Sequence, residues 1–193
     1  MPRTKNFNKD AVLEQAMELF WKKGYYATSV QDLVDHLGIN RGSLYNTYGG
    51  KKELFDEAFH HYRTVNTEVV KKFLYKQKNV REGLRALFEL AIKQSQKDPD
   101  HKGCFVVNST IEFIPNDAVT IEVLNQNKVQ FEKIFYNYLL SGVEKGEISA
   151  DKDLSTIATL LFTYYNGLKV VTKLEFNSQR FLNSVKSLLS ILD

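Results

Sequence analysis

At 193 residues with a 43% hydrophobic share, the chain is long enough to bury a core, as one small and one larger helical unit. Its single cysteine excludes an intrachain disulfide framework, and a net charge of +3 is too small to indicate a nucleic-acid partner by itself. No apolar run is long enough to cross a bilayer, and the N-terminus lacks the apolar segment of a secretory signal, so we expect a cytoplasmic protein without a membrane partner.

The first helix is expected to run from a cap at Asn8 to Lys23, with Gly24 ending it. Four apolar residues recur at the spacing of one helix face: Val12, Ala16, Leu19 and Phe20. Trp21 and the Tyr25-Tyr26 pair lie beside this stripe, where aromatic rings usually pack in a core or hinge. We therefore interpret them as packing residues, not as platforms for base stacking.

Two short helices joined by a tight turn are predicted next. Thr28 or Ser29 can cap the first helix, and Gly38 can adopt the left-handed conformation that ends it. Asn40 can cap the second helix, which spans residues 41–48 and has one evident core anchor, Leu44. The rest of that helix is rich in hydrogen-bond donors. Such composition is typical of a DNA recognition helix, because hydroxyl, amide and guanidinium groups can reach base edges and phosphates.

Several motifs occur in order across this region: Leu19-Phe20, Gly24, Thr28-Ser29, Gly38-Ile39, Leu44-Tyr45, Tyr48, Lys51 and Leu54. Together they resemble the TetR family of bacterial transcriptional repressors. Val34 stands where a small Ala is usual, and Thr47 where His or Tyr is common, so the resemblance does not imply a phosphate contact at position 47. It implies an all-α fold with a three-helix helix-turn-helix DNA-binding domain at residues 1–50. A helical domain for effector binding and dimerisation would follow at residues 51–193.

The predicted DNA contacts divide into base and phosphate contacts. We expect Arg41, Ser43 and Asn46 to read bases, because they project from the face that Leu44 leaves free. Lys51 is expected to contact phosphate, since a cation in the first turn of a helix opposes the helix dipole unless an anion lies opposite. The full set of expected DNA-binding residues is Thr28, Ser29, Arg41, Gly42, Ser43, Tyr45, Asn46, Tyr48 and Lys51, with Thr28, Tyr45 and Tyr48 also assigned to phosphates.

Beyond Leu54 the sequence predicts helices throughout. An apolar stripe continues to Tyr62, and further helices are expected at residues 66–76, 80–97, 103–113, 117–144, 153–173 and 178–192. The last two helices carry wider apolar faces than a small bundle needs, which indicates a partner surface. The resemblance implies that the partner is a second copy. The residues expected at this homodimer interface are Ile157, Leu161, Leu168, Leu182, Val185, Leu189 and Leu192.

A second motif lies in the predicted helix at 103–113. Cys104, Asn108 and Glu112 are spaced at i, i+4 and i+8, so their side chains share one face. The motif resembles a Gly-Cys...Asn...Glu signature found in a subset of the family that includes repressors responding to electrophiles. Two interpretations stay open. Either Cys104 is a reactive sensor at a helix start, or it is a small buried hydrophobe while Asn108 and Glu112 cap neighbouring helices.

An effector cavity is expected inside the helical body, because ligand sites combine apolar walls with a few placed polar groups. The residues expected to line it are Cys104, Phe105, Asn108, Glu112, Tyr136, Tyr165 and Asn166. The effector would be small and apolar or aromatic. No constellation indicates catalysis, no cofactor is expected, and the adjacent His60 and His61 point in different directions, which makes a metal site improbable.

The expected function is a homodimeric repressor that binds palindromic operator DNA and is released by a small-molecule effector. Three alternatives differ in what the helical body does. The protein could sense electrophiles through Cys104. It could be an activator, or a repressor, that has no small-molecule effector. It could also be a helical enzyme or transport-associated protein that merely contains a turn-like segment.

Overall fold

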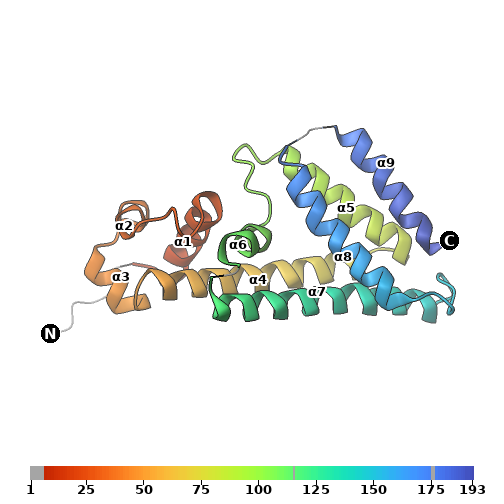
Figure 1. Ribbon diagram of the computed structural model, residues 1–193, viewed down its shortest axis with the longest axis horizontal. Helices are drawn as coiled ribbons and strands as arrows, with labels where there is room; N and C mark the ends of the chain where they lie inside the picture. Colours follow the sequence, from red (N-terminus) through yellow and green to blue (C-terminus); the bar gives the residue numbers. More distant parts are fainter. Residues whose placement is uncertain (1–6, 115, 175–176) are drawn as a thin grey trace.

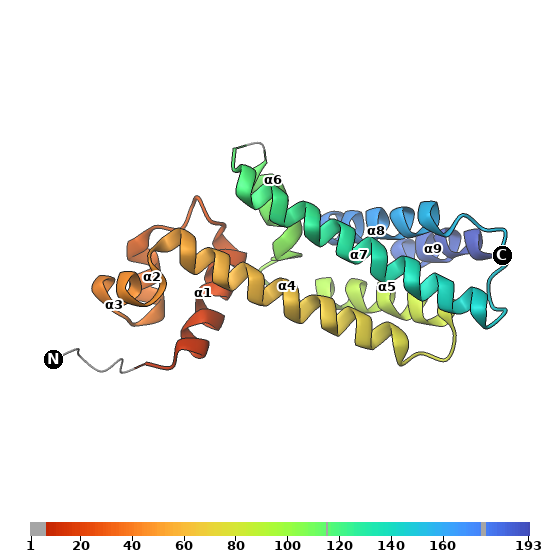
Figure 2. The same ribbon diagram turned by 90° about the horizontal axis from the view of Figure 1, so that it is seen from below.

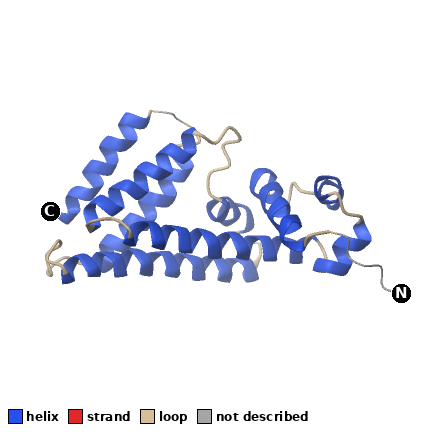
Figure 3. Cartoon of the chain, turned by 180° about the vertical axis from the view of Figure 1, so that it is seen from behind, coloured by secondary structure: helices blue, strands red, loops and turns tan. Residues whose placement is uncertain are grey.

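The computed structural model describes residues 7–114, 116–174 and 177–193, and all regular structure in these ranges is helical (Figure 3). The first six residues of the predicted DNA-binding domain lie outside the described ranges. No described helix is both long enough and apolar enough to cross a membrane. The elements in chain order are α1 (Lys9–Lys23), α2 (Val30–Leu37), α3 (Arg41–Tyr48), α4 (Lys51–Tyr75), α5 (Val80–Gln96), α6 (Phe105–Phe113), α7 (Ala118–Glu144), α8 (Leu154–Val171), α9 (Ser178–Leu189) and a final 3-10 turn (Ser190–Leu192).

The molecule is elongated, with its small N-terminal unit at one end (Figure 1). Helices α4 and α7 lie side by side along its length, and α5, α8 and α9 gather at the other end (Figure 2). Helix α6 packs over the middle of α4, between the two ends. We call α1 to α3 the head and α5 to α9 the body; α4 belongs to both and joins them.

The head helices begin at the caps that the sequence predicts. The Asn8 side chain accepts from two backbone N–H groups of the first turn of α1, and the Asn40 side chain accepts from the Ser43 N–H at 2.8 Å. Ser29 and Asp32 form a reciprocal capping box at the start of α2. Gly38 ends α2 in the left-handed conformation, with φ of 63°. The all-α prediction and these starts and stops are confirmed.

The head does not close its own core. Phe20 of α1, Leu33 of α2 and Leu44 of α3 are fully buried in one cluster that also contains the first two turns of α4. The same cluster takes in Phe105 and Phe113 of α6. The boundary at residue 50 stays a prediction, but this core extends across it. A movement of α4 or α6 would therefore displace the helices of the head directly, because their side chains pack in the same core.

The predicted helix bounds after residue 54 differ most from the structure at two helix starts, and the ends expected at residues 173 and 192 are at Val171 and Leu189. Helix α4 is one continuous element, although a new helix was expected from residue 66, because Thr64, Val65 and Asn66 each lower helix propensity by only about 0.7 kcal/mol or less. Helix α6 begins two residues late because Gly103 has a φ of 65° and Cys104 is extended. A Cβ at Gly103 would lie 3.1 Å from the Lys169 carbonyl oxygen, so glycine permits this close approach to α8.

Candidate functional site

The outer face of α3 presents the predicted reading residues. Leu44 anchors the helix in the core, whereas Arg41, Tyr45 and Asn46 are exposed and Ser43 is half-buried beside them. The Arg41 guanidinium lies 5.7 Å from the centre of the Tyr45 ring, which keeps both side chains on the outer face. No acidic residue occurs in α3. The face therefore offers hydrogen-bond donors to base edges and phosphates. No carboxylate of the same helix would repel the phosphates.

Two residues that were predicted to contact phosphates have buried side chains, so that prediction is wrong for these side chains. Thr28 is 0% exposed, and its hydroxyl donates to the Gly24 carbonyl at 2.5 Å. Tyr48 is 5% exposed, and its hydroxyl donates to the Lys9 carbonyl at 3.1 Å. Burial raises the pKa of Tyr48 to about 12, so it remains a neutral donor at physiological pH. Both hydroxyls tie the head together internally instead of facing DNA.

The side chain of Ser29 is exposed, but its oxygen already serves the capping box: it donates to Asp32 Oδ2 at 2.7 Å and accepts from the Asp32 N–H at 3.0 Å. Lys23 pairs with the same carboxylate at 2.7 Å. The contacts from Lys23 and Ser29 hold the pKa of Asp32 well below its usual range. Gly42 is exposed in the first turn of α3. DNA contacts at Ser29 and Gly42 stay predictions.

Lys51 lies at the N-terminus of α4, with its Nζ 4.2 Å from the centre of the Tyr25 ring. The cap residue Gly50 has no side chain to accept from the first-turn N–H groups. Burial lowers the pKa of Lys51, while the charges of Glu112 and Asp32 raise it. A phosphate at this helix end would meet a cation, unpaired N–H groups and the positive end of the helix dipole. The geometry suits a phosphate contact.

Glu112 joins α6 to the head. Its carboxylate accepts from the backbone N–H of Tyr25 at 3.0 Å and of Tyr26 at 2.7 Å, in the loop after α1. A Cβ at Gly24 would lie 3.0 Å from the same carboxylate, so the glycine lets the loop close around it. Hydrogen bonds to a charged acceptor are about twice as strong as neutral ones. Glu112 thus satisfies two backbone donors of the loop between α1 and α2, which agrees with a structural role but is not the helix cap that the second interpretation expected.

The first turn of α6 faces α8 and α4. Cys104 is buried, and the Tyr62 hydroxyl donates to its Sγ at 3.8 Å. Asn108 donates to the Lys102 carbonyl at 2.8 Å and accepts from Lys173 Nζ at 2.9 Å. Asn108 therefore ties the α5–α6 loop to the end of α8. Asn108 and Glu112 lie on α6, whereas Cys104 precedes it in an extended conformation, and each of the three contacts a different neighbour.

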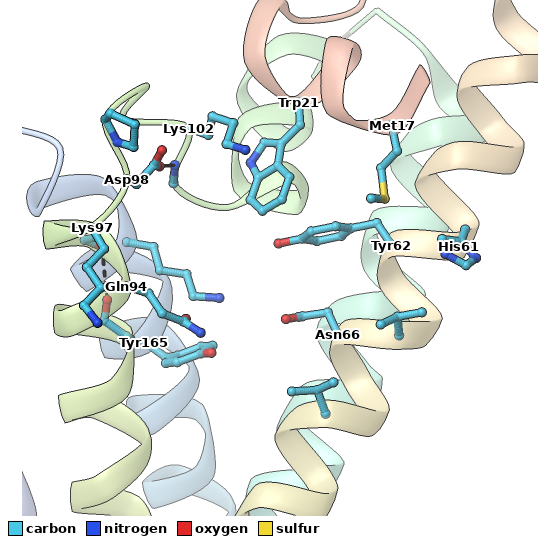
Figure 4. Close-up of a pocket in the computed structure, with 17 residues that line it drawn as sticks. Met17, Trp21, His61, Tyr62, Asn66, Gln94, Lys97, Asp98, Lys102 and Tyr165 are labelled. Atoms are coloured by element: carbon cyan, nitrogen blue, oxygen red, sulfur yellow. Dashed lines mark hydrogen bonds between the residues drawn. The ribbon is translucent and has the colours of Figure 1, made fainter. Parts of the chain in front are cut away.

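A cavity of about 600 Å³ lies between α4 on one side and α5 and α8 on the other. Figure 4 shows Tyr62 and Asn66 of α4 facing Gln94 of α5 and Tyr165 of α8 across it. Its upper end is formed by the head, through Met17 and Trp21 of α1 (Figure 4). The α5–α6 loop closes another side with Asp98, Pro99, Lys102 and Gly103. Since this volume is in the range of small-molecule sites, the cavity is the candidate effector site.

The predicted lining of the cavity is mostly wrong. Tyr165 lines it, while Cys104 and Asn166 line a separate void of about 10 Å³ that Tyr165 also borders. Phe105 is 1% exposed in the core beneath the head, and Tyr136 is on the outer side of α7. The remaining two residues, Asn108 and Glu112, make the structural hydrogen bonds described above and do not line the cavity. Helical spacing could not show which neighbours the three residues of the motif contact.

The prediction that the residues of the dimer interface form an exposed surface of one chain is also wrong. Leu161 is 0% exposed and Leu189 is 2% exposed, because α8 and α9 bury them against α5 and α7 within one chain. The same body core contains Ile157, Leu168, Val185 and Leu192, and Leu182 packs against it. The opposite side of α8 is exposed over the residues that we call the α8 stripe: Leu160, Thr163, Gly167, Val170 and Val171.

Comparison with known proteins places these features in a family. Residues 12–58 match the family described as bacterial regulatory proteins, tetR family, and residues 81–187 match the tetracyclin repressor-like, C-terminal domain. The chain belongs to the TetR family of bacterial regulatory proteins. It is therefore a DNA-binding transcriptional regulator and not an enzyme.

Two relatives and one solved structure illustrate the similarity. The chain is 36% identical over 195 residues to the uncharacterized HTH-type transcriptional regulator YezE of Bacillus subtilis (strain 168), covering 100% of both chains. It is 28% identical to the repressor ComR of Escherichia coli (strain K12), over 87% of this chain and 80% of ComR. A cysteine mutant of the TetR-family regulator CifR, solved with 26-bp double-strand operator DNA, is 27% identical with a TM-score of 0.87; the match covers 99% of this chain and 100% of CifR.

Four residues of this TetR-family chain line the cavity although no sequence pattern singles them out for a binding site: Trp21, Tyr62, Lys102 and Lys169. Trp21 does pack as expected, with its ring 5.0 Å from Tyr62, but it also lines the cavity. Around Lys102 and Lys169, the charged residues are spaced as they are on any solvated helix face or loop. Only the meeting of α1, α4, the α5–α6 loop and α8 brings them together, so no local pattern could have identified them.

Proposed function

We propose that this protein is a homodimeric repressor, acting in the cytoplasm, that a small molecule bound in the cavity releases from palindromic operator DNA. The observation that carries this proposal is that the head supplies part of the cavity, through Met17 and Trp21 of α1. A molecule in the cavity would touch the DNA-binding unit itself, without a relay through the whole body. The cavity and the exposed face of α3 are thereby connected through the packing of the head.

The DNA-binding step follows from two heads on one dimer. Recognition helices of this type enter successive major grooves when their centres are about 34 to 36 Å apart, or a multiple of that distance. Arg41, Ser43 and Asn46 would then meet base edges, while Lys51 and the first turn of α4 would meet a phosphate. Base contacts give specificity, whereas phosphate contacts position the protein and bind all sequences.

Replacing Lys51 and Asn46 separately should distinguish these roles. Lys51→Ala is expected to weaken binding to all DNA sequences and to lower the slope of log K against log salt by about one. Asn46→Ala is expected to cost about 1 to 3 kcal/mol on the preferred site and to relax selectivity at one base pair. Fluorescence anisotropy with labelled duplexes at several salt concentrations measures both effects.

Lys145→Ala is the matched control for charge, because Lys145 is exposed beyond the end of α7, at the end of the body away from the head. It should leave both affinity and salt slope unchanged. If Lys51→Ala and Asn46→Ala behaved like this control, the assignment of the α3 face and the α4 N-terminus to DNA would be wrong.

The α8 stripe supports dimerisation through α8 and α9. Leu160, Val170 and Val171 expose apolar side chains on it. Gly167 lies inside the helix, where glycine costs about 1 kcal/mol relative to alanine. A Cβ at Gly167 would meet nothing within 4 Å, so the fold of one chain does not require glycine there. Close approach of a second backbone at this point would require it.

Two further contacts, besides the wall that α1 forms, support coupling between the cavity and the head. Lys102 of the α5–α6 loop pairs with Glu18 of α1 at 2.7 Å, and Glu112 at the other end of α6 holds the loop before α2. The loop and α6 thus contact the head at two places. An effector that prefers a different spacing of the heads would shift the population away from the DNA-binding state. For a shift from 1:99 to 99:1 it needs a differential affinity of about 5.5 kcal/mol.

A second candidate function is electrophile sensing through Cys104. The supporting observation is its surroundings: the Tyr62 hydroxyl contacts the thiol, and Lys169 borders the same small void. An added alkyl group would not fit in about 10 Å³, so modification would force α6 away from α8 and disturb the Glu112 contacts.

Titration with N-ethylmaleimide tests this candidate. If Cys104 is the sensor, operator binding of the wild type should fall in proportion to alkylation of the thiol, while Cys104→Ser should keep its binding. Mass spectrometry reports the modified fraction, and mobility shift reports the binding. Equal loss in both proteins, or full alkylation without loss, would remove the sensor role and leave non-covalent release.

A further inference from the structure

We propose that the effector is an anion, specifically a small carboxylate with an apolar or aromatic body. This inference rests on the proposed function, since it names the chemical class of molecule that the cavity takes.

The charged groups around the cavity are mainly cationic. Lys97, Lys102 and Lys169 line it, and Asp98 is the one acidic residue among the described residues of its lining. The Asp98 carboxylate is used within its own loop, where its oxygens accept from the backbone N–H groups of Asp100 at 3.3 Å and Gly103 at 3.2 Å. It therefore stabilises the loop, and none of the ion pairs between described residues joins it to a lysine of the cavity.

Lys169 is the cation that most needs an anion. Its Nζ lies 4.1 Å from the centre of the Tyr165 ring, but none of the ion pairs between described residues includes it. Lys102, by contrast, already pairs with Glu18. Burial acts to lower the pKa of Lys169, and its contacts with Cys104 and Tyr165 raise the pKa above the usual lysine value. The side chain is therefore a charged ammonium at neutral pH, and a ligand carboxylate would give it the carboxylate partner that no described ion pair supplies.

A second group in the wall also lacks an acceptor. The Trp21 Nε1 is buried and has no hydrogen-bond partner in the part of the chain that the structure describes. An indole N–H can only donate. The ammonium of Lys102 lies 4.7 Å from the Trp21 ring, and the Tyr62 hydroxyl points into the cavity (Figure 4). The donors on this wall are thus the unpartnered Trp21 indole, the Lys102 ammonium, which pairs with Glu18, and the Tyr62 hydroxyl, which contacts Cys104 Sγ at 3.8 Å. A carboxylate supplies acceptors only.

The rest of the wall is suited to the body of the molecule. Met17, Val65, Val69, Ala91 and Pro99 give it aliphatic surface, and the rings of Trp21, Tyr62 and Tyr165 give it flat surface. Burial of apolar area against these side chains would supply most of the affinity, and the cations would supply the selectivity for charge.

The single tryptophan of the chain is Trp21, so its fluorescence reports directly on the cavity. Three pairs of probes with matched bodies test the charge: benzoate and benzamide, 4-phenylbutanoate and 4-phenylbutanamide, and decanoate and decanamide. Each is titrated into the whole protein with excitation at 295 nm. We expect at least one carboxylate to bind about tenfold more tightly than its amide. If no carboxylate is preferred over its amide, or if none of the six molecules binds, the proposal is overturned.

Lys169→Met identifies the group responsible, because methionine keeps most of the apolar length and removes the charge. The preference for the carboxylate should disappear in Lys169→Met and remain in Lys71→Met, whose lysine is exposed on α4 outside the cavity. Cys104→Ser should also keep the preference, since it leaves Lys169 in place. Loss of the preference in Cys104→Ser but not in Lys169→Met would mean that the thiol region, not the lysine, determines selectivity, and would overturn the assignment.

The operator readout is separate from the binding readout. A carboxylate that binds at Trp21 without releasing DNA would support the anion site and contradict effector release. A neutral molecule that releases DNA, combined with no preference for carboxylates, would contradict the anion site and leave effector release standing.

Discussion

Leu160→Glu should convert the protein to a monomer and abolish operator binding. Leu160 is 38% exposed on the α8 stripe, so one folded chain can accept a glutamate there. In a dimer the same carboxylate would be buried against apolar groups of the second copy, where an unpaired charge costs several kcal/mol. A single head makes half of the DNA contacts. Sedimentation velocity at micromolar concentration measures the mass, and mobility shift measures the binding.

The neighbouring position provides the contrast. Leu161 is 0% exposed in the body core, so Leu161→Glu should cost about 4 kcal/mol or more and unfold the body, with loss of the helical circular dichroism signal. Leu160→Glu should keep that signal. A folded Leu160→Glu protein that still sediments as a dimer would show that the α8 stripe is not the interface.

Glu112→Gln should loosen the head and weaken operator binding. The substitution keeps the shape of the side chain but replaces one acceptor oxygen by an amide that faces backbone N–H groups of Tyr25 and Tyr26. Losing one charge-assisted bond and leaving a donor without a partner should cost about 2 kcal/mol. For a chain of this size, each kcal/mol lowers Tm by roughly 2 to 4 °C. Calorimetry gives the Tm, and we expect operator affinity to fall about tenfold because α2 and α3 are less firmly oriented.

Glu122→Gln serves as the control, since Glu122 is exposed on α7 and, within the part of the chain that the structure describes, accepts a hydrogen bond only from its helical neighbour Gln126. It should change neither Tm nor affinity. If Glu112→Gln gave the same result as Glu122→Gln, the carboxylate would not hold the head, and the coupling through α6 would have to be abandoned.

The sequence predicts the head well because its signals are local. A cap such as Asn40, a left-handed glycine such as Gly38 and a core anchor such as Leu44 act within one or two turns, and the structure confirms each. Thr28 and Tyr48 show the limit. Their hydroxyls are directed by α1, through Gly24 and Lys9, so a family pattern of polar residues near DNA did not reveal that they face inward.

The cavity could not be predicted because it depends on contacts between distant segments. Trp21 and Lys169 are separated by most of the chain, yet both line it. The prediction of the residues that contact a second copy failed for a related reason. Periodicity correctly identified Leu161 and Leu189 as one apolar face, but it could not show that α5 and α7 already cover that face within one chain. The exposed α8 stripe, with Thr163 and Gly167, has a composition that does not stand out.

Selection of binding sites from a random-sequence DNA library tests the central claim most directly, because it requires no knowledge of the operator. The account predicts enrichment of an inverted repeat whose half-sites lie about 10 bp apart, centre to centre, or a multiple of that spacing, bound by two copies of the chain. Binding to the enriched duplex should be at least about a thousandfold tighter than binding to unrelated duplex DNA. Enrichment of no sequence, or of a single site without a repeat bound by one copy, would contradict the account.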